Sequence, residues 1–297
     1  YLEQKKYELA KEQAKKVIEL NPESNEGYLA LEQVYFNQKK YELAEEQAKK
    51  MIELNPESNE GYLALGRIYL EQKKYDLAEE QTKKAIKLNP EEKENYLILR
   101  RNYLEQKKYE LAEEPAKKVI ELNPESEDEY LALGRIYLKQ KKYDLANEQI
   151  QKAIELNPKS RESYLLLGAI LFNQKKYKLA EEHVKKAIKL NPKSEDGYLT
   201  LGKIYLEQNN YNLVEEHVKK AIKLNPTNEQ GYLILGTVSL KQENYNLAKE
   251  HVKKAIELNP TNEHGYLSLG EVYLEQKNYN LAKEQAEKAI ELNPTNE

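Results

Sequence analysis

The tripeptide Leu-Asn-Pro recurs along the whole chain at an interval of 34 residues, without a single insertion or deletion. Its proline falls at Pro22, Pro56, Pro90, Pro124, Pro158, Pro192, Pro226, Pro260 and Pro294. A strict period of this length is typical of stacked structural repeats, in which each copy packs only against its neighbours. The period therefore predicts one continuous array over residues 1–297, although length alone would suggest about two ordinary domains.

The period divides the chain into a partial unit and full units of 34 residues. Residues 1–24 form the partial unit, and the eight full units are 25–58, 59–92, 93–126, 127–160, 161–194, 195–228, 229–262 and 263–296. We name each slot of the unit by the residue that occupies it in the copy 59–92. All 24 tyrosines of the chain fall into three slots, those of Tyr62, Tyr69 and Tyr75. An aromatic residue confined to fixed slots indicates a packing role.

Two amphipathic helices are expected in each unit. Tyr62, Leu65 and Tyr69 fall on one face of a first helix, and Ala78 and Ala85 on one face of a second. Ser58 is expected to cap the first helix, and Pro90 to follow the end of the second. The turn between them, Gln72 to Lys74, contains no glycine and is weakly marked. Gly66 indicates a close crossing of the two helices.

Composition and charge exclude several classes of function. The formal net charge is -4, and lysine and glutamate are interspersed along the chain. No basic stripe is therefore available for nucleic acid or an anionic membrane. No apolar run is long enough to span a membrane, and no secretion signal is recognisable. The chain contains no cysteine, which excludes disulfides and thiolate metal sites. These features favour a cytoplasmic protein.

The residues Tyr62, Leu65, Gly66, Ala78 and Pro90, repeated at this period, resemble the tetratricopeptide repeat (TPR). The resemblance covers the whole chain, although Tyr62 stands where that family usually has tryptophan. It implies an all-α fold, a right-handed superhelical solenoid of antiparallel helix pairs whose first helices line a concave groove. It also implies a scaffold that holds a peptide or a partner protein in that groove.

The candidate contact site follows from the slots that the resemblance assigns to the groove. The Leu63 slot is leucine in every full copy, whereas the Arg67 slot varies between copies and is arginine in three successive ones. We therefore expect an apolar floor flanked by basic side chains that could hold a carboxylate. The predicted peptide-binding residues are Leu63, Arg67, Leu97, Arg101, Leu131, Arg135 and Lys139. The alternative is that the arginines pair with Glu71 and Glu105, and that the leucines pack between repeats.

No catalytic or metal-binding pattern stands out from the repeat. His183, His217 and His251 recur one unit apart, and no two histidines lie four residues apart on one helix, so we interpret them as surface residues. There is no nucleophile triad and no phosphate-binding glycine loop. The sequence predicts neither an enzyme nor a bound cofactor or metal.

The copy 93–126 departs from its siblings at four slots. Asn95 replaces a frequent glycine, Arg100 replaces Gly66, Asn102 replaces Ile68, and Pro115 replaces Gln81. Each change weakens packing or the helix, because Pro115 removes a backbone donor and Asn102 buries an amide. A local kink or late start of the second helix, a polar contact site, and a decayed copy are the three alternatives. We favour decay with a kink, and expect the least protected amides in this copy.

Neither end of the array carries a polar capping helix, and apolar residues such as Leu281 and Ile290 are left uncovered. We therefore expect a fragment of a longer chain, or end-to-end association of arrays. For the array itself, two alternatives to peptide binding stay open. It could be a structural spacer or self-associating array without a groove ligand, or the regulatory array of an enzyme whose catalytic domain lies outside this chain.

Overall fold

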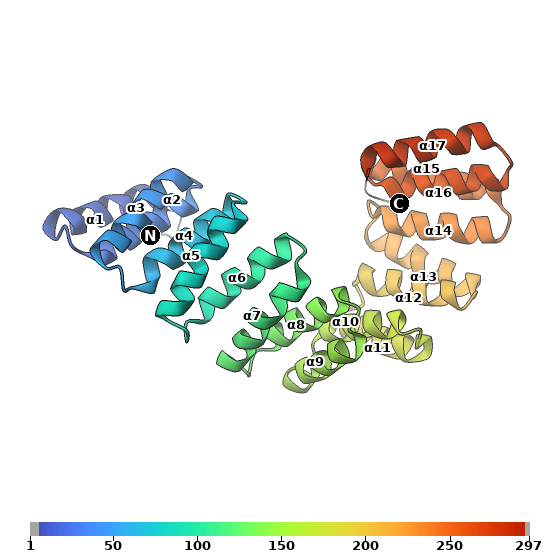
Figure 1. Cartoon of the computed structure of the whole chain (residues 1–297). Helices are drawn as coiled ribbons and strands as arrows, with labels where there is room; N and C mark the ends of the chain where they lie inside the picture. Colours follow the sequence, from blue (N-terminus) through green and yellow to red (C-terminus); the bar gives the residue numbers. More distant parts are fainter. Residues whose placement is uncertain (1–5, 295–297) are drawn as a thin grey trace. The chain divides into compact units, whose positions relative to one another are not determined.

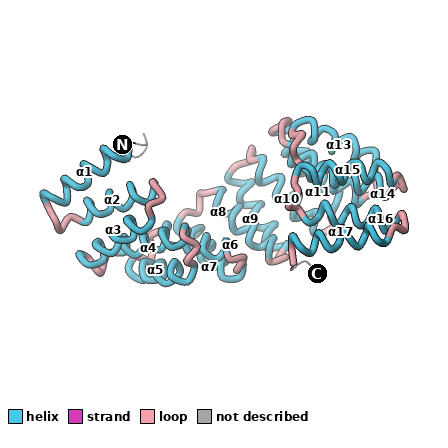
Figure 2. The backbone as a smooth tube through the Cα atoms, turned by 90° about the horizontal axis from the view of Figure 1, so that it is seen from above, coloured by secondary structure: helices cyan, strands magenta, loops and turns pink. Residues whose placement is uncertain are grey.

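The computed structural model describes residues 6–294 of the chain, and this part contains seventeen helices and no strand. The all-α prediction is confirmed. The chain divides into two compact units, Tyr1–Leu156 and Asn157–Glu297. Within each unit, helices that follow one another in sequence pack side by side as antiparallel pairs (Figure 1). Short loops connect them (Figure 2).

The described residues of the first unit form nine helices. Odd-numbered helices are the second helices of a repeat, and even-numbered helices are the first. The nine helices are α1 (Tyr7–Leu20), α2 (Asn25–Asn37), α3 (Tyr41–Leu54), α4 (Asn59–Glu71), α5 (Tyr75–Leu88), α6 (Lys93–Glu105), α7 (Tyr109–Leu122), α8 (Glu127–Lys139) and α9 (Tyr143–Leu156).

The described residues of the second unit form eight helices, and even-numbered helices are again the first helices of a repeat. The eight helices are α10 (Arg161–Asn173), α11 (Tyr177–Leu190), α12 (Glu195–Glu207), α13 (Tyr211–Leu224), α14 (Glu229–Lys241), α15 (Tyr245–Leu258), α16 (Glu263–Glu275) and α17 (Tyr279–Leu292).

The helix boundaries follow from capping interactions. The Ser58 side chain accepts a hydrogen bond from the Glu60 amide, as the sequence predicts for the start of α4. The first helix ends in a reverse turn, in which Lys73 has a φ of 59° and the Lys74 amide donates to the Tyr69 carbonyl at 2.8 Å. This turn is the usual C-terminal cap, but lysine takes the left-handed position that glycine normally holds. The missing glycine is why the turn is weakly marked in the sequence.

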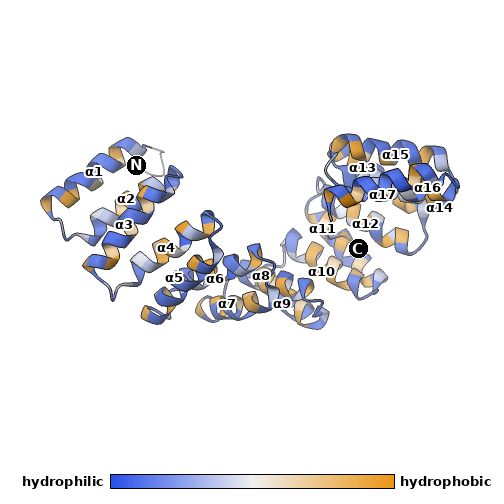
Figure 3. Ribbon diagram, turned by 45° about the horizontal axis from the view of Figure 1, so that its top comes forward, coloured by the Kyte–Doolittle hydropathy of each residue, from blue (hydrophilic) through white to orange (hydrophobic). Residues whose placement is uncertain are grey.

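The core lies between the two helices of each repeat and between adjacent repeats. Ile68, Ala78 and Ala85 are fully buried, and hydrophobic and hydrophilic residues are interspersed along each helix (Figure 3). A β-carbon at Gly66 would collide with the Thr82 side chain of α5. The close crossing predicted at Gly66 is therefore confirmed.

A polar network joins successive repeats. The Tyr69 hydroxyl of α4 donates to Glu45 of the preceding repeat at 3.0 Å, and Glu45 also pairs with Lys49 at 2.6 Å. Burial and this hydrogen bond raise the pKa of Tyr69 to about 12. The same three slots form the network again at Tyr103, Tyr137 and Tyr205. Through these contacts the tyrosine of the Tyr69 slot fixes the alignment of neighbouring repeats, in addition to its place in the core.

The irregular copy folds with the same helix bounds as its siblings. Helix α7 begins at Tyr109 and continues through Pro115 to Leu122. The alternative that the second helix starts late, near Glu114, is therefore wrong. The helix begins at its usual residue because Ala112 and Val119 are fully buried, and their packing fixes the turn on either side of the proline.

Candidate functional site

The predicted contact residues lie on three successive first helices of the first unit, α4, α6 and α8. We call the face formed by the Glu60, Leu63, Arg67, Leu70 and Glu71 slots the first-helix stripe. Along it Leu63 and Leu97 are half-buried, whereas Leu131 has only 2% of its surface exposed. Leu70 is also buried, with 1% exposed. Part of the predicted apolar floor is therefore packed within the array.

Arg67 is held by a carboxylate of the preceding repeat. Its guanidinium donates to both oxygens of Glu32, at 3.0 and 2.8 Å, and lies 4.3 Å from the centre of the Phe36 ring. The Glu32 side chain is fully buried. Burial raises the pKa of Glu32 despite the opposing charge of Arg67. Arg67 therefore balances a buried carboxylate, and its charge is committed to the fold.

Arg101 is held in the same way by two glutamates. It pairs with Glu71 of the preceding repeat at 2.7 Å and with Glu105 of its own helix at 3.0 Å. Although burial opposes it, these two carboxylates raise the pKa of Arg101. Arg135 and Lys139 are exposed on α8. In the first unit, two basic residues of the first-helix stripe, Arg67 and Arg101, thus form ion pairs within the array.

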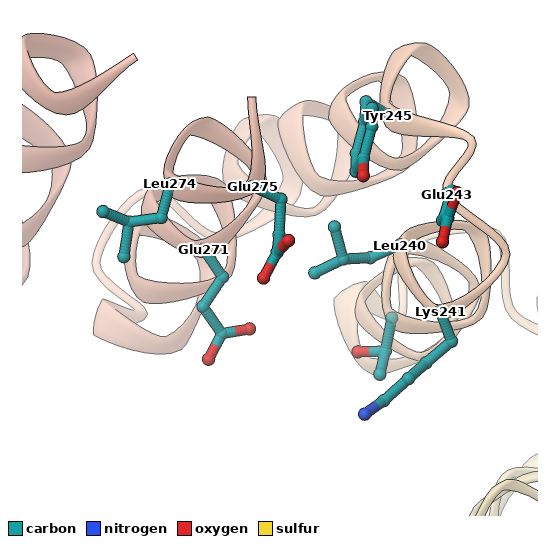
Figure 4. Close-up of a pocket in the computed structure, with 8 residues that line it drawn as sticks. Leu240, Lys241, Glu243, Tyr245, Glu271, Leu274 and Glu275 are labelled. Atoms are coloured by element: carbon teal, nitrogen blue, oxygen red, sulfur yellow. The ribbon is translucent and has the colours of Figure 1, made fainter. Parts of the chain in front are cut away.

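A hollow of about 500 Å³ opens on the stripe of the second unit, between α14 and α16. Leu240 of α14 and Glu275 of α16 face each other across it, and Tyr245 of α15 closes one side (Figure 4). Leu274 lies beside Glu275 on α16, with 52% of its surface exposed. The hollow thus joins apolar walls to a charged rim.

The charges around this hollow are mainly acidic. Glu243, Glu271 and Glu275 line it together with one cation, Lys241. The ion pairs found in residues 6–294 involve none of these four side chains. Unlike the arginines of the first unit, these carboxylates are available to a ligand.

The hollow lies on slots that the sequence analysis assigns to the groove, but the hollow itself was not predicted. Leu240, Glu271 and Glu275 occupy the Leu70, Arg67 and Glu71 slots, which the sequence assigns to the groove. The variation of the Arg67 slot, which becomes Thr237 and Glu271 in the last two copies, was the signal that could have found it. Nothing in the sequence pointed to Glu243 or Tyr245, because Glu243 lies in the turn and Tyr245 at the start of the second helix.

The polar residues of the irregular copy have partners. Arg100 forms an ion pair with Glu129 of the next repeat at 2.5 Å, and both side chains are largely buried. The Asn102 amide donates to the Tyr75 carbonyl at 3.0 Å, and the Asn95 amide to the Asn89 carbonyl at 3.0 Å. Glu129 itself replaces a glycine, so Arg100 and Glu129 are complementary changes in adjacent copies. These contacts speak against simple decay.

The three histidines are not open surface residues. His183 stacks on Tyr164 with a centroid distance of 6.1 Å, and His217 lies 5.2 Å from the Tyr205 ring. All three histidines are half-buried, because this slot packs against the first helix of the same repeat. Burial lowers the pKa of His183 and His251. Across residues 6–294 no three His, Asp or Glu side chains are grouped to hold a metal ion.

Among the described helices, none combines the length and the apolar character needed to cross a membrane. No curated protein sequence matches the chain. Models of the tetratricopeptide repeat match residues 1–59, 59–92, 131–195, 171–236 and 239–297. The irregular copy lies between the matched segments.

Two solved structures share the fold. The APC/C hetero-tetramer Cut9–Hcn1 matches with a TM-score of 0.58 and 18% identity, over 87% of this chain and 51% of the other, so this chain spans about half of its length. Pseudomonas aeruginosa pilF matches with a TM-score of 0.55 and 21% identity, over 68% of this chain and 92% of the other. Because models of the tetratricopeptide repeat match most of the chain, it belongs to the tetratricopeptide repeat family, whose arrays are protein-interaction scaffolds.

Proposed function

We propose that the chain binds a partner protein or peptide along the first-helix stripe, and that the hollow between α14 and α16 receives a basic side chain of that partner. The observation that carries the proposal is the set of unpaired carboxylates, Glu243, Glu271 and Glu275, around an open apolar hollow. A lysine or arginine stem would pack on Leu240 and Leu274 while its head reaches a carboxylate.

The predicted site of the first unit stays part of the proposal, with a restriction. An acidic partner would have to displace Glu71 and Glu105 from Arg101 before it could bind there. Breaking such pairs offsets most of the gain from a new pair. We therefore expect Leu63, Leu97, Leu131, Arg67, Arg101, Arg135 and Lys139 to contribute less than the hollow.

A titration with two peptides of opposite charge tests the proposal. One peptide carries lysines spaced by leucine and alanine, and the other carries glutamates in the same frame. We expect the lysine peptide to bind the array at low salt, and the triple change E243Q, E271Q and E275Q to weaken it at least tenfold. Equal changes on exposed second-helix glutamates, E216Q, E250Q and E284Q, form the matched control.

Two outcomes would count against this function. Equal loss in the control variant would mean that binding reflects only the net charge. Saturable binding of neither peptide would favour the structural spacer, for which the internal ion pairs of the first unit are well suited. Binding of the glutamate peptide alone would move the site to the arginines.

We also propose end-to-end association of arrays. Leu20 and Ile290 are exposed apolar residues, with 81% and 57% of their surface accessible. Such residues become buried if arrays stack on each other. Sedimentation at increasing concentration should show growing species, and a concentration-independent monomer would contradict this proposal.

A further inference from the structure

A second cavity lies away from the first-helix stripe, in the irregular repeat. It occupies about 540 Å³ between α5, α6 and α7, and we call it the Pro115 pocket. Its apolar walls are Ile86, Tyr96, Leu99, Tyr103, Leu111 and Pro115. None of these residues belongs to the stripe, so the cavity is independent of the function proposed above.

The pocket lies where proline replaces a longer side chain. In other copies the Gln81 slot carries glutamine or histidine, and two of the histidines pack on tyrosines of their own first helix. His183 stacks on Tyr164, and His217 contacts the ring of Tyr205. Pro115 occupies this slot in α7, and its short ring cannot reach across Tyr96 and Tyr103. Both rings line the pocket; Tyr96 is half-buried, and Tyr103 is 5% exposed.

The tyrosines present ring surface to the pocket and keep their hydroxyl groups elsewhere. The Tyr96 hydroxyl donates to the Pro90 carbonyl at 3.0 Å, and the Tyr103 hydroxyl donates to Glu79 at 2.9 Å. A planar apolar ring could stack on these faces or meet them edge-on.

The same substitution leaves a hydrogen-bond acceptor beside the pocket. Proline has no N–H group, so the Leu111 carbonyl, one turn earlier in α7, lacks the donor that every sibling helix supplies. Leu111 is 50% exposed, compared with 43% for Leu77 and 41% for Leu145 in the same slot. The acceptor thus belongs to a residue that lines the pocket.

The charged rim of the pocket disfavours an anionic ligand. Lys83 pairs with Glu79, Lys118 with Glu121, and Glu114 with Lys117, at 2.5, 3.2 and 3.1 Å. These three charges are already balanced within the chain, and the remaining charged side chain, Glu110, is negative, so an anion gains nothing by entering.

We propose that the Pro115 pocket binds the indole ring of a tryptophan side chain on a partner polypeptide. The indole fills the cavity and packs on the tyrosines that line it, Tyr96 and Tyr103, and its N–H donates to the Leu111 carbonyl. An aromatic ring with a single N–H donor is the side chain that meets both requirements.

The test uses the absence of tryptophan from this chain, because a tryptophan probe is then the only indole emitter. The capped tripeptide Gly-Trp-Gly is titrated with the array and followed by fluorescence anisotropy. The same peptide with naphthylalanine, which has the ring without the N–H, and free indole are titrated in parallel. We expect saturable binding of the tryptophan peptide, and binding of the naphthyl peptide that is severalfold weaker.

The decisive variant is P115Q, which restores both the sibling side chain and the backbone N–H. It removes a helix-breaking residue, so it should fold and melt at a higher temperature than the natural chain. We expect it to lose at least tenfold in affinity for the tryptophan peptide, whereas Q47H, a change to the sibling residue in a regular repeat, keeps the affinity.

Three results would overturn the proposal. These are no saturable binding of the tryptophan peptide, equal affinity of P115Q and the natural chain, and equal affinity for the naphthyl peptide. Binding of free indole without binding of the peptide would also contradict a partner side chain as the occupant.

Discussion

The first-helix stripe differs between the two units in what its charges do. In the first unit, Arg67 neutralises the buried Glu32, and Arg101 is clamped by Glu71 and Glu105. In the second, Glu271 and Glu275 border an open hollow without a paired cation. The same slots thus hold internal ion pairs in one unit and unpaired carboxylates in the other. In a repeat array, the residue in a slot does not reveal its role until its neighbours in adjacent copies are known.

The largest effect is expected from Arg67→Ala. This change leaves the Glu32 carboxylate buried without its cation, which should cost about 3 kcal/mol of unfolding free energy. The double change Glu32→Ala with Arg67→Ala should recover most of that loss, because no buried charge remains. Denaturant unfolding of the two single variants and the double variant gives the coupling directly. Additive losses would mean that the pair does not stabilise the first unit.

The pair of Arg100 and Glu129 extends the comparison to the irregular copy. Arg100→Ala should destabilise the chain by about 2 kcal/mol, since Glu129 would lose its partner in a site with little access to water. Glu129→Ala should cost less, and the double variant should resemble Glu129→Ala. If Arg100→Ala were neutral, the irregular copy would be decayed as the sequence suggested.

Glu113→Gln tests the polar network between repeats, and its expected effect on the unfolding free energy is of intermediate size. Although burial opposes it, hydrogen bonds from Lys117 and Lys142 lower the pKa of Glu113 to about 2. The charged form therefore stabilises the fold above the ordinary pKa of 4.5, and this part is lost as the pH falls from about 4.5 to 2. At pH 7 the variant should lose about 1 to 2 kcal/mol, and its acid unfolding curve should be flatter. Unfolding curves of equal slope in acid would contradict the network.

A smaller effect on stability is expected in mild acid, and it concerns the second unit only. Burial lowers the pKa of His183 and His251 in the second unit below 6.5, so the unfolded chain takes up protons first and stability falls as the pH falls through 6.5. The change of both to glutamine, the residue of this slot in α3 and α5, should remove this dependence. We expect a difference below about 1 kcal/mol between pH 7.5 and 5.5 in thermal unfolding. A pH dependence that is unchanged in the variant would show that other groups cause it.

The smallest effect is expected in the hollow itself. Glu271→Gln with Glu275→Gln should change the unfolding free energy by less than about 0.5 kcal/mol, because these carboxylates form no internal pair. A larger loss in denaturant unfolding would show that they serve the fold, as their counterparts in the first unit do.

The repeat period, the helix pairs and the role of Gly66 could all be predicted from the sequence, because each depends on contacts within a single copy. The sequence could not show that Arg67 pairs with Glu32 or that Arg101 pairs with Glu71, because each arginine also has a glutamate four residues later on its own helix. The Pro115 pocket could not be predicted either, because a missing side chain leaves a cavity only if neither helix moves to fill it.

The most direct test of the central claim is a side-chain NMR titration of the array with labelled leucine methyl groups. With the lysine peptide, we predict saturable shifts at Leu240 and Leu274 beside the hollow. With the glutamate peptide, we predict no saturable shift at Leu63 or Leu97, because their neighbouring arginines are already paired. Saturable shifts at Leu63 and Leu97 with the glutamate peptide, and none at Leu240, would contradict the account.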